Sequence, residues 1–307
     1  MDLEDRIKGV IFGVALGDAL GGPLEFMKQE DIRWEYGLVE QMLGGGWLEL
    51  EPGETTDDTA MMLCIIKGIL DNPDDPIEEI GKHFLDWYAS KPKAIGSTTE
   101  HALKAYLAEY DWLKAGELAH RASHGKSAGN GALMRCGPIA FFYRDNYEKM
   151  IEITIKQSRM THIDPVGIEA CCIKNHIIWE FLQERTLEEG IKKALDKYDT
   201  HHRYRDCLDK NLIYKDLKPT GFAVDTLRCS LYALLHTKDY HDAVVMAVNM
   251  GGDADTIGAV TGGMAGAYYG YSSMPAVWMY QLKCFHEIDE LWRLLRTYII
   301  KNEKKDR

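Results

Sequence analysis

Apolar residues recur at helical spacing along most of the chain. Between Asp5 and Leu20 they fall three or four positions apart, as in a helix that packs one face against a core. The same spacing predicts further helices at residues 76–90, 98–110, 113–124, 146–158, 165–183, 186–198, 222–236, 239–249 and 287–300. Strand-like alternation occurs only near 39–50, where three successive glycines would interrupt a strand. The pattern therefore predicts an all-α protein, and the lack of a Ser/Gly/Pro-rich linker predicts one domain over residues 1–307.

Two of the predicted helices carry glycine at every fourth position. The first series is Gly9, Gly13, Gly17 and Gly21, and the second, after Asp255, is Gly258, Gly262, Gly266 and Gly270. Glycine in a helix interior costs about 1 kcal/mol relative to alanine, so its repeated use needs a reason. A stripe without side chains lets two helix axes approach closely. We therefore expect these two helices to pack tightly together.

Two acidic clusters, at residues 56–59 and 253–256, each follow a glycine turn and each open an apolar helical pattern. A single capping oxygen is enough for a helix start and stabilises it by about 0.5–2 kcal/mol, whereas each cluster offers at least three oxygen-bearing side chains. Carboxylate and hydroxyl oxygens suit Mg²⁺, Mn²⁺ or Ca²⁺, and four aspartates brought together would repel one another without cations. The sequence favours a site for two divalent cations, with helix capping as the alternative.

The composition disfavours some classes of binding partner and indicates the cellular compartment. A formal charge of −12 and a pI of about 5.4 argue against a general affinity for nucleic acid or for anionic membranes. The seven cysteines contain no C-x-x-C pair, which is typical of a reducing compartment, and the acidic N-terminus lacks the basic region of a signal peptide. We expect a cytoplasmic monomer with no nucleic-acid or membrane partner.

Three further segments are interpreted as structural. Residues 257–282 are the one apolar stretch that resembles a membrane span, but Ser272, Ser273 and Pro275 interrupt it, so a buried helix is expected. The polar interval 196–219 is predicted to be a surface excursion. Residues 301–307 are predicted to be a frayed tail.

Three shorter motifs are candidates for chemistry. Glu25 lies in a Gly-Gly-Pro loop after the first helix, where a solvated carboxylate is the ordinary reading. Glycines surround Asn130 just before a helical run, so free N–H groups could face a phosphate, although an Asn-Gly turn would also explain them. His162 precedes a helix that opens with Asp164 and Pro165, and could equally be structural. No serine-hydrolase elbow, H-E-x-x-H motif or Walker A loop is present, which disfavours those reaction classes.

Taken in order, these pieces resemble the ADP-ribosylglycohydrolase family, and within it the bacterial dinitrogenase-reductase-activating glycohydrolases. The matching motifs are Gly-Asp-Ala-Leu-Gly, Pro-Gly-Glu-x-Thr-Asp-Asp-Thr, Gly-Asn-Gly, Thr-His and Gly-Gly-Asp-Ala-Asp-Thr, spread over about residues 5 to 290. The resemblance implies a compact, orthogonal multi-helix globule. It further implies a centre of two Mg²⁺ or Mn²⁺ ions that serves removal of ADP-ribose from a modified protein side chain, for which we expect arginine.

The resemblance also assigns site residues by position. The implied metal ligands are Thr56, Asp57, Asp58, Asp253, Asp255 and Thr256. Glu25 matches a mobile loop acid and, together with Asp58, is a candidate catalytic carboxylate. The implied ligand-binding residues are Ser127, Gly129, Asn130, Gly131, His162, Gly221 and Phe222, the last offering a ring to adenine.

One position departs from the family pattern. Bacterial members commonly carry an aspartate, assigned as a catalytic base, just before Ile-Gly-x-Thr-Thr, and this chain has Ala94 there. Alanine cannot take a proton, so either Glu25 or a metal-bound hydroxide suffices, or the chain is a catalytically weakened variant. A protein that binds ADP-ribose without turning it over is a second alternative. A two-metal nucleotide phosphohydrolase is a third alternative.

Overall fold

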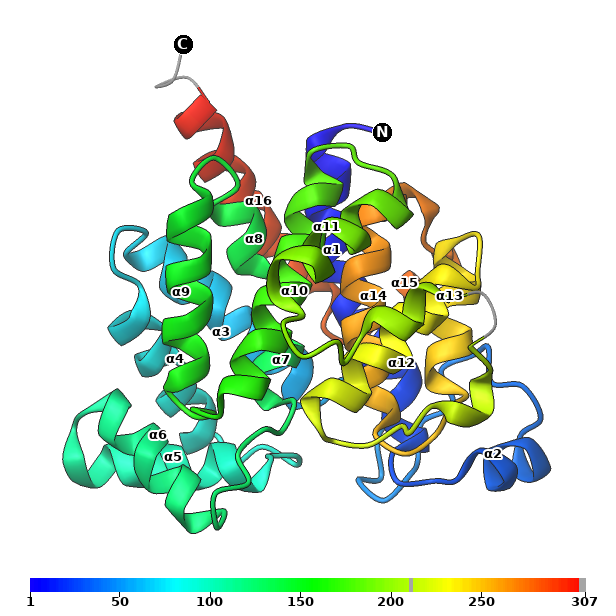
Figure 1. The fold of residues 1–307 in the computed structure, drawn as a ribbon, viewed down its shortest axis with the longest axis horizontal. Coiled ribbons are helices and arrows are strands. Elements are labelled where there is room, and N and C mark those ends of the chain that lie inside the picture. Colours follow the sequence, from blue (N-terminus) through cyan, green and yellow to red (C-terminus); the bar gives the residue numbers. More distant parts are fainter. Residues whose placement is uncertain (210–211, 304–307) are drawn as a thin grey trace.

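Helices account for the regular secondary structure of residues 1–209 and 212–303, the part of the chain that this computed structural model describes (Figure 1). No strand forms in that part, where only isolated bridges such as Gly45–Leu50 occur. The all-α prediction is therefore confirmed. The longer helices are α1 (Leu3–Gly21), α3 (Asp57–Asp71), α4 (Ile77–Ala89), α5 (Ser97–Glu109), α6 (Trp112–Ala122), α9 (Tyr147–Arg159), α10 (Pro165–Leu182), α11 (Leu187–Tyr198), α12 (Ala223–Leu235), α13 (Tyr240–Val248), α14 (Ala254–Tyr269) and α16 (Phe285–Glu303).

Several shorter helices were not predicted because they are too short to show a periodic apolar pattern. They are α2 (Gln29–Glu35), α7 (Gly131–Arg135), α8 (Pro138–Phe142) and α15 (Ala276–Gln281), with 3-10 turns η1 (Gly22–Leu24), η2 (Arg205–Leu208), η3 (Tyr214–Asp216) and η4 (Tyr271–Ser273).

Helices α1 and α14 pack against each other near the centre of the molecule (Figure 1). Their glycines face one another in antiparallel order, Gly9 with Gly266, Gly13 with Gly262 and Gly17 with Gly258. A Cβ atom on Gly13 would lie 2.1 Å from the carbonyl oxygen of Gly262, far inside van der Waals contact. The predicted close packing is confirmed, except that Gly270 ends α14 at φ +82° and Ala254 is the partner of Gly21.

One helix in the described part of the chain is long and apolar enough to cross a membrane. It covers Leu3–Leu24, with a mean hydropathy of 1.3, and 94% of its most apolar window is buried inside the protein. The span-like character of this helix was not predicted from the sequence. Residues 257–282, expected to be a buried helix interrupted by polar residues and proline, are indeed divided into the buried α14 followed by η4 and α15. Such an apolar helix is equally typical of the core of a protein, and here α14 covers it.

The two segments expected to lie at the surface are more ordered than predicted. Within 196–219 the side chains of Tyr204 and Cys207 are buried, because the carboxylate of Asp199 accepts hydrogen bonds from the backbone N–H groups of Arg203 and Tyr204 and folds the chain inward. The predicted tail begins too early, since α16 continues to Glu303. The rest of that tail, residues 304–307, lies outside the described residues.

One apolar core draws on nearly the whole described chain. It includes buried side chains from Ile7 in α1 to Ile299 in α16, with no break at any linker. The single-domain organisation stays a prediction, and this shared core is the observation that supports it.

Candidate active site

A buried carboxylate on α1 fixes the start of α3. Both Asp18 oxygens accept a hydrogen bond from the Thr56 N–H at 3.0 Å, and Oδ2 also accepts from the Thr59 N–H at 3.0 Å and the Thr59 hydroxyl at 2.5 Å. Burial raises the pKa of Asp18 to about 6, although these hydrogen bonds oppose the rise. No role for Asp18 was predicted from the sequence. The available signal was an acidic residue inside a glycine-rich apolar helix.

The two acidic clusters converge, although nearly 200 positions separate them in sequence. The Thr56 hydroxyl donates to Asp58 Oδ2 at 3.3 Å and to Asp255 Oδ2 at 3.4 Å, and the Thr256 hydroxyl donates to Asp58 Oδ2 at 3.3 Å. The α1–α14 glycine contact makes this possible, because it sets the C-terminal end of α1 beside the N-terminal end of α14. The helix starts therefore form one site, and capping alone does not explain them.

The carboxylates present a donor set for a hard cation. Oxygens of Glu25, Asp253 and Asp255 all lie within 4.8 Å of one another. Asp58 Oδ1 is buried and has no hydrogen-bond partner among the described residues. An unpartnered buried carboxylate oxygen is costly, and a bound cation would satisfy it. The donor set fits Mg²⁺, Mn²⁺ or Ca²⁺, which prefer oxygen ligands.

The pKa shifts of the carboxylates also favour a bound cation. Burial raises the pKa of Asp57 to about 6 and of Glu25 to about 7, with neighbouring carboxylates adding to both shifts. Burial, and then the charges of the surrounding acids, holds the pKa of Asp58 and of Asp255 well above the usual range. So many close carboxylates cannot all ionise at neutral pH without positive charge between them.

A cavity of about 360 Å³ opens above this cluster. Glu25, Asp57, Asp58, Asp253, Asp255 and Thr256 line it on one side. Glu25 accepts a hydrogen bond from Trp47 Nε1 at 2.7 Å, and the ring of Phe26 lies 5.5 Å from that of Trp47, between centroids. Phe26 has φ +66°, a conformation rare for a bulky residue and often found at functional sites.

The glycine-rich loop forms another wall of the cavity. Gly129, Asn130, Gly131 and Gly221 line it, and the Asn130 side chain donates from Nδ2 to Asp253 Oδ2 at 2.9 Å. Two of the predicted ligand-binding residues do not line it. The Ser127 side chain instead hydrogen bonds His120 Nδ1 at 2.6 Å, and Phe222 is 41% exposed beside the bridge it forms with Gly129.

His162 also lines the cavity, and its tautomer follows from its hydrogen bonds. Arg135 Nη2 donates to Thr161 Oγ1 at 2.8 Å, and the same oxygen lies 2.7 Å from His162 Nδ1. No other acceptor for the buried Thr161 hydroxyl is found among the described residues, so its proton goes to Nδ1. Nε2, next to Gly131, therefore carries hydrogen and is available as a donor. Burial, with the charge of Arg135, lowers the pKa of His162 to about 3 and keeps the ring neutral.

Ala94 lies at the edge of the same cavity. Its side chain packs with Leu48 and Leu50 in a small apolar cluster. Two residues on, the Gly96 N–H donates to Asp57 Oδ2 at 3.3 Å. The segment thus keeps its contact with the acidic cluster while contributing no carboxylate of its own at position 94.

The chain is similar to known proteins of one family. The ADP-ribosylglycohydrolase family profile matches residues 1–305. The chain is 33% identical over 281 residues to the ADP-ribosyl-[dinitrogen reductase] glycohydrolase of Rhodospirillum rubrum, covering 91% of each chain. It is 31% identical to the ADP-ribosylarginine hydrolase Tri1 of Serratia proteamaculans, covering 91% of this chain and 75% of the relative.

A solved structure gives the same result for the fold. An ADP-ribosylglycohydrolase-related protein complex superposes with a TM-score of 0.81 at 31% identity, covering 96% of this chain and 98% of that one. A match along the whole chain and a shared fold leave one conclusion: this chain belongs to the ADP-ribosylglycohydrolase family, a family of hydrolases.

Proposed function

We propose that this protein is a divalent-cation-dependent hydrolase that releases ADP-ribose from modified arginine side chains of proteins by cleavage at ribose C1′. The observation that carries the proposal is the meeting of Asp58 with Thr256 and of Thr56 with Asp255 beneath the cavity that Glu25 lines. The names of two relatives, which specify ADP-ribosylarginine and ADP-ribosyl-[dinitrogen reductase], support the substrate class. We further propose two Mg²⁺ or Mn²⁺ ions as cofactors.

The acidic residues have a definite task in such a reaction. Thr56, Asp57, Asp58, Asp253, Asp255 and Thr256 would hold the cations, which offset the carboxylate charge and polarise substrate oxygens. Cleavage at C1′ passes through an oxocarbenium-like transition state, which nearby carboxylates stabilise. Oxygens of Asp253 and Asp255 lie within 4.8 Å of an oxygen of Glu25, which supports this role.

Glu25 is the residue best placed to move a proton. It lines the cavity, and burial raises its pKa to about 7, near the value at which a group exchanges protons most effectively at neutral pH. Trp47 holds one oxygen of the carboxylate, which leaves the other oxygen free of that contact. Glu25 then accepts the proton of the water that attacks C1′. The C1′–N bond breaks, and the arginine side chain leaves as a guanidine that takes up this proton. His162 donates from Nε2 to an oxygen of the bound ADP-ribose.

The experiment that tests the proposal identifies the product. Peptides carrying ADP-ribosyl-arginine or ADP-ribosyl-serine are incubated with the protein and Mg²⁺ or Mn²⁺, and the products are read by mass spectrometry. We expect intact ADP-ribose from the arginine peptide and none after Asp57→Asn. Release of AMP and ribose phosphate would mean attack at phosphorus and would establish the phosphohydrolase alternative.

A second candidate function rests on Ala94. Where relatives commonly carry an aspartate, this chain presents a methyl group packed on Leu48 and Leu50, as a binder of ADP-ribose without turnover would. Assays of the unaltered chain beside Ala94→Asp separate the two functions. Binding of ADP-ribose by calorimetry with no product from the unaltered chain, and product from Ala94→Asp, would establish the binder. Turnover by the unaltered chain would dismiss it.

A further inference from the structure

Exposed apolar side chains are concentrated on one segment beside the cavity. In the described part of the chain sixteen large apolar side chains are exposed, and six of them lie between residues 26 and 47. They are Phe26, Trp34, Tyr36, Leu38, Leu43 and Trp47. Exposed apolar area costs about 25 cal/mol per Å². Single exposed apolar residues are common, whereas six on one short segment, two of them lining the cavity, point to a surface that binds a partner.

The backbone of this segment is fixed to the body of the protein. The Phe26 N–H donates to the Gly252 carbonyl at 2.6 Å, and the Gly252 N–H donates to the Met27 carbonyl at 2.7 Å. Further along, Asn249 holds Val39 through both the N–H and the carbonyl, each at 2.9 Å. The apolar side chains are therefore presented on a preformed support, which lowers the entropy cost of binding.

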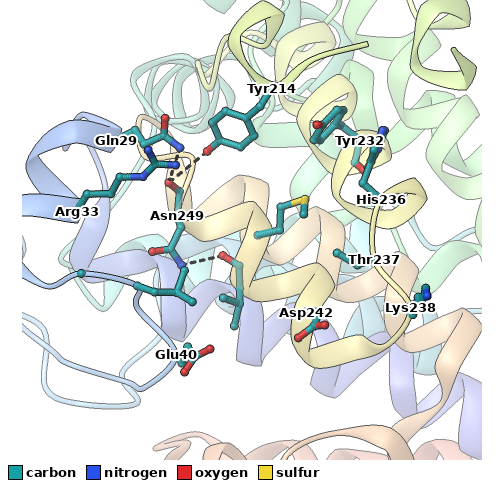
Figure 2. A pocket seen from close by; sticks show the side chains of 14 residues that line it. Gln29, Arg33, Glu40, Tyr214, Tyr232, His236, Thr237, Lys238, Asp242 and Asn249 are labelled. Carbon is teal, nitrogen blue, oxygen red and sulfur yellow. Dashed lines mark hydrogen bonds between the residues drawn. The ribbon is translucent and has the colours of Figure 1, made fainter. Parts of the chain in front are cut away.

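The segment is continuous with the catalytic cavity. Phe26 and Trp47 line that cavity, and Phe26 also lines an adjacent cavity of about 360 Å³ together with Gln29 and Tyr214. These last two then line a groove of about 900 Å³ between α2, α12 and α13, to which Leu38 also belongs. Figure 2 shows this groove, with Gln29 on one side and the stacked rings of Tyr232 and His236 on the other.

We infer that the segment 26–47 is the surface on which the ADP-ribosylated protein docks. A modified side chain that enters the cavity leaves its polypeptide at the rim, and on this side the rim is made of Phe26 and Trp47. The partner is a protein with an apolar patch next to the modified arginine, which covers Trp34 and Leu38. The inference rests on the proposed function and adds that protein substrates are preferred over the free modified amino acid.

The test compares a protein substrate with a small one. Proteins of the source cell, ADP-ribosylated on arginine by an added transferase, are followed site by site by mass spectrometry. Free ADP-ribosyl-arginine is followed in parallel. Trp34→Ser and Leu38→Ser are assayed with Leu294→Ser as the control, because Leu38 and Leu294 are exposed to nearly the same extent, 62% and 63%, and Leu294 lies on α16.

We expect Trp34→Ser and Leu38→Ser to slow hydrolysis of the most rapidly processed protein sites by about tenfold, the size of effect seen at the minority of interface residues that carry most of the binding energy. Turnover of free ADP-ribosyl-arginine and the melting temperature should not change, and Leu294→Ser should behave as the unaltered protein. Equal rates at every protein site would overturn the docking surface. Failure of the unaltered protein to hydrolyse both the protein sites and the free compound would instead contradict the proposed function.

Discussion

Gly17 of α1 and Gly258 of α14 approach so closely that a Cβ atom on Gly17 would lie 2.0 Å from the Gly258 carbonyl oxygen. Gly17→Ala must therefore push the two helices apart, and we expect a loss of about 1–3 kcal/mol in the free energy of unfolding, as in overpacked cores. Metal affinity should fall with it, because the contact aligns the two acidic clusters.

The matched control for that substitution is Gly167→Ala on α10. A Cβ atom there would meet its nearest neighbour at an ordinary 3.6 Å. The substitution should leave stability unchanged or raise it by up to about 1 kcal/mol through helix propensity. Urea unfolding measures the free energy of unfolding of both variants. Equal values would show that the glycine contact is not tight in solution.

Asp57→Asn and Asp255→Asn should each lose cation binding and hydrolysis together, because each removes one carboxylate from the convergent cluster. Calorimetric titration with Mn²⁺ measures the first effect and product release the second. Asp74→Asn, an exposed acid on the loop before α4, is the control and should keep both. Unchanged turnover in both cluster variants would refute the site.

Without cations, stability should fall as pH rises from about 4 to about 7. The folded protein holds protons on Asp57 and Glu25, whose pKa values are about 6 and about 7, more tightly than the unfolded chain, where ordinary values apply. Deprotonation in this window therefore favours unfolding. In EDTA, the melting temperature should be lower at pH 7.5 than at pH 5. Addition of Mg²⁺ should raise the melting temperature more at pH 7.5 than at pH 5. A higher melting temperature at pH 7.5 in EDTA would contradict the cluster's electrostatics.

Trp47→Phe should move the acidic limb of the pH–rate profile to higher pH. The indole N–H bonds to Glu25 and stabilises its ionised form, so removing it raises the pKa of Glu25 further. Glu25 must be ionised to act as a base, so the reaction then needs a higher pH. Trp34→Phe, at a residue that does not line the cavity, should leave the pH profile of kcat/KM unshifted, and a shift equal to that of Trp47→Phe would argue against this role of Trp47.

Glu25→Gln should lower kcat by about 10² to 10⁴.

Thr161→Val should change the tautomer of His162. The valine cannot donate to Nδ1, so the imidazole hydrogen is free to move there, and ¹⁵N chemical shifts of labelled histidine report the change. KM for the substrate should rise because Nε2 loses its hydrogen. Thr161→Ser keeps the hydroxyl and should restore both the ¹⁵N chemical shifts and the KM of the unaltered protein. If the Nε2–H tautomer persists in Thr161→Val, the hydrogen bond from Thr161 does not set the tautomer.

Much of this architecture follows from periodicity and spacing. The amphipathic patterns placed most of the long helices within a few residues, and the four-residue glycine series anticipated the α1–α14 contact. The acidic clusters at 56–59 and 253–256 were predicted to share one site, because each helix start carries more oxygen-bearing side chains than a cap requires.

Other features depend on tertiary contacts that no local pattern encodes. Asp18 was missed because its partners, Thr56 and Thr59, lie about 40 residues away. The burial of Tyr204 depends on a turn closed by Asp199. The polar composition of the surrounding segment predicted an exposed position instead. Ser127 was assigned by position in a loop, but its side-chain direction depends on His120.

The pairing of α1 with α14 also constrains how the protein is made. The helix from Leu3 to Leu24 is synthesised before the glycine face of α14 that covers it, and more than 200 residues separate the two along the chain. During that interval a membrane-like stretch has no permanent cover, and nascent chains with exposed apolar surface are prone to aggregate. Dependence on chaperones should therefore be highest before residue 254 is synthesised, and a chain cut short there would lack both the helix that covers α1 and the second acidic cluster.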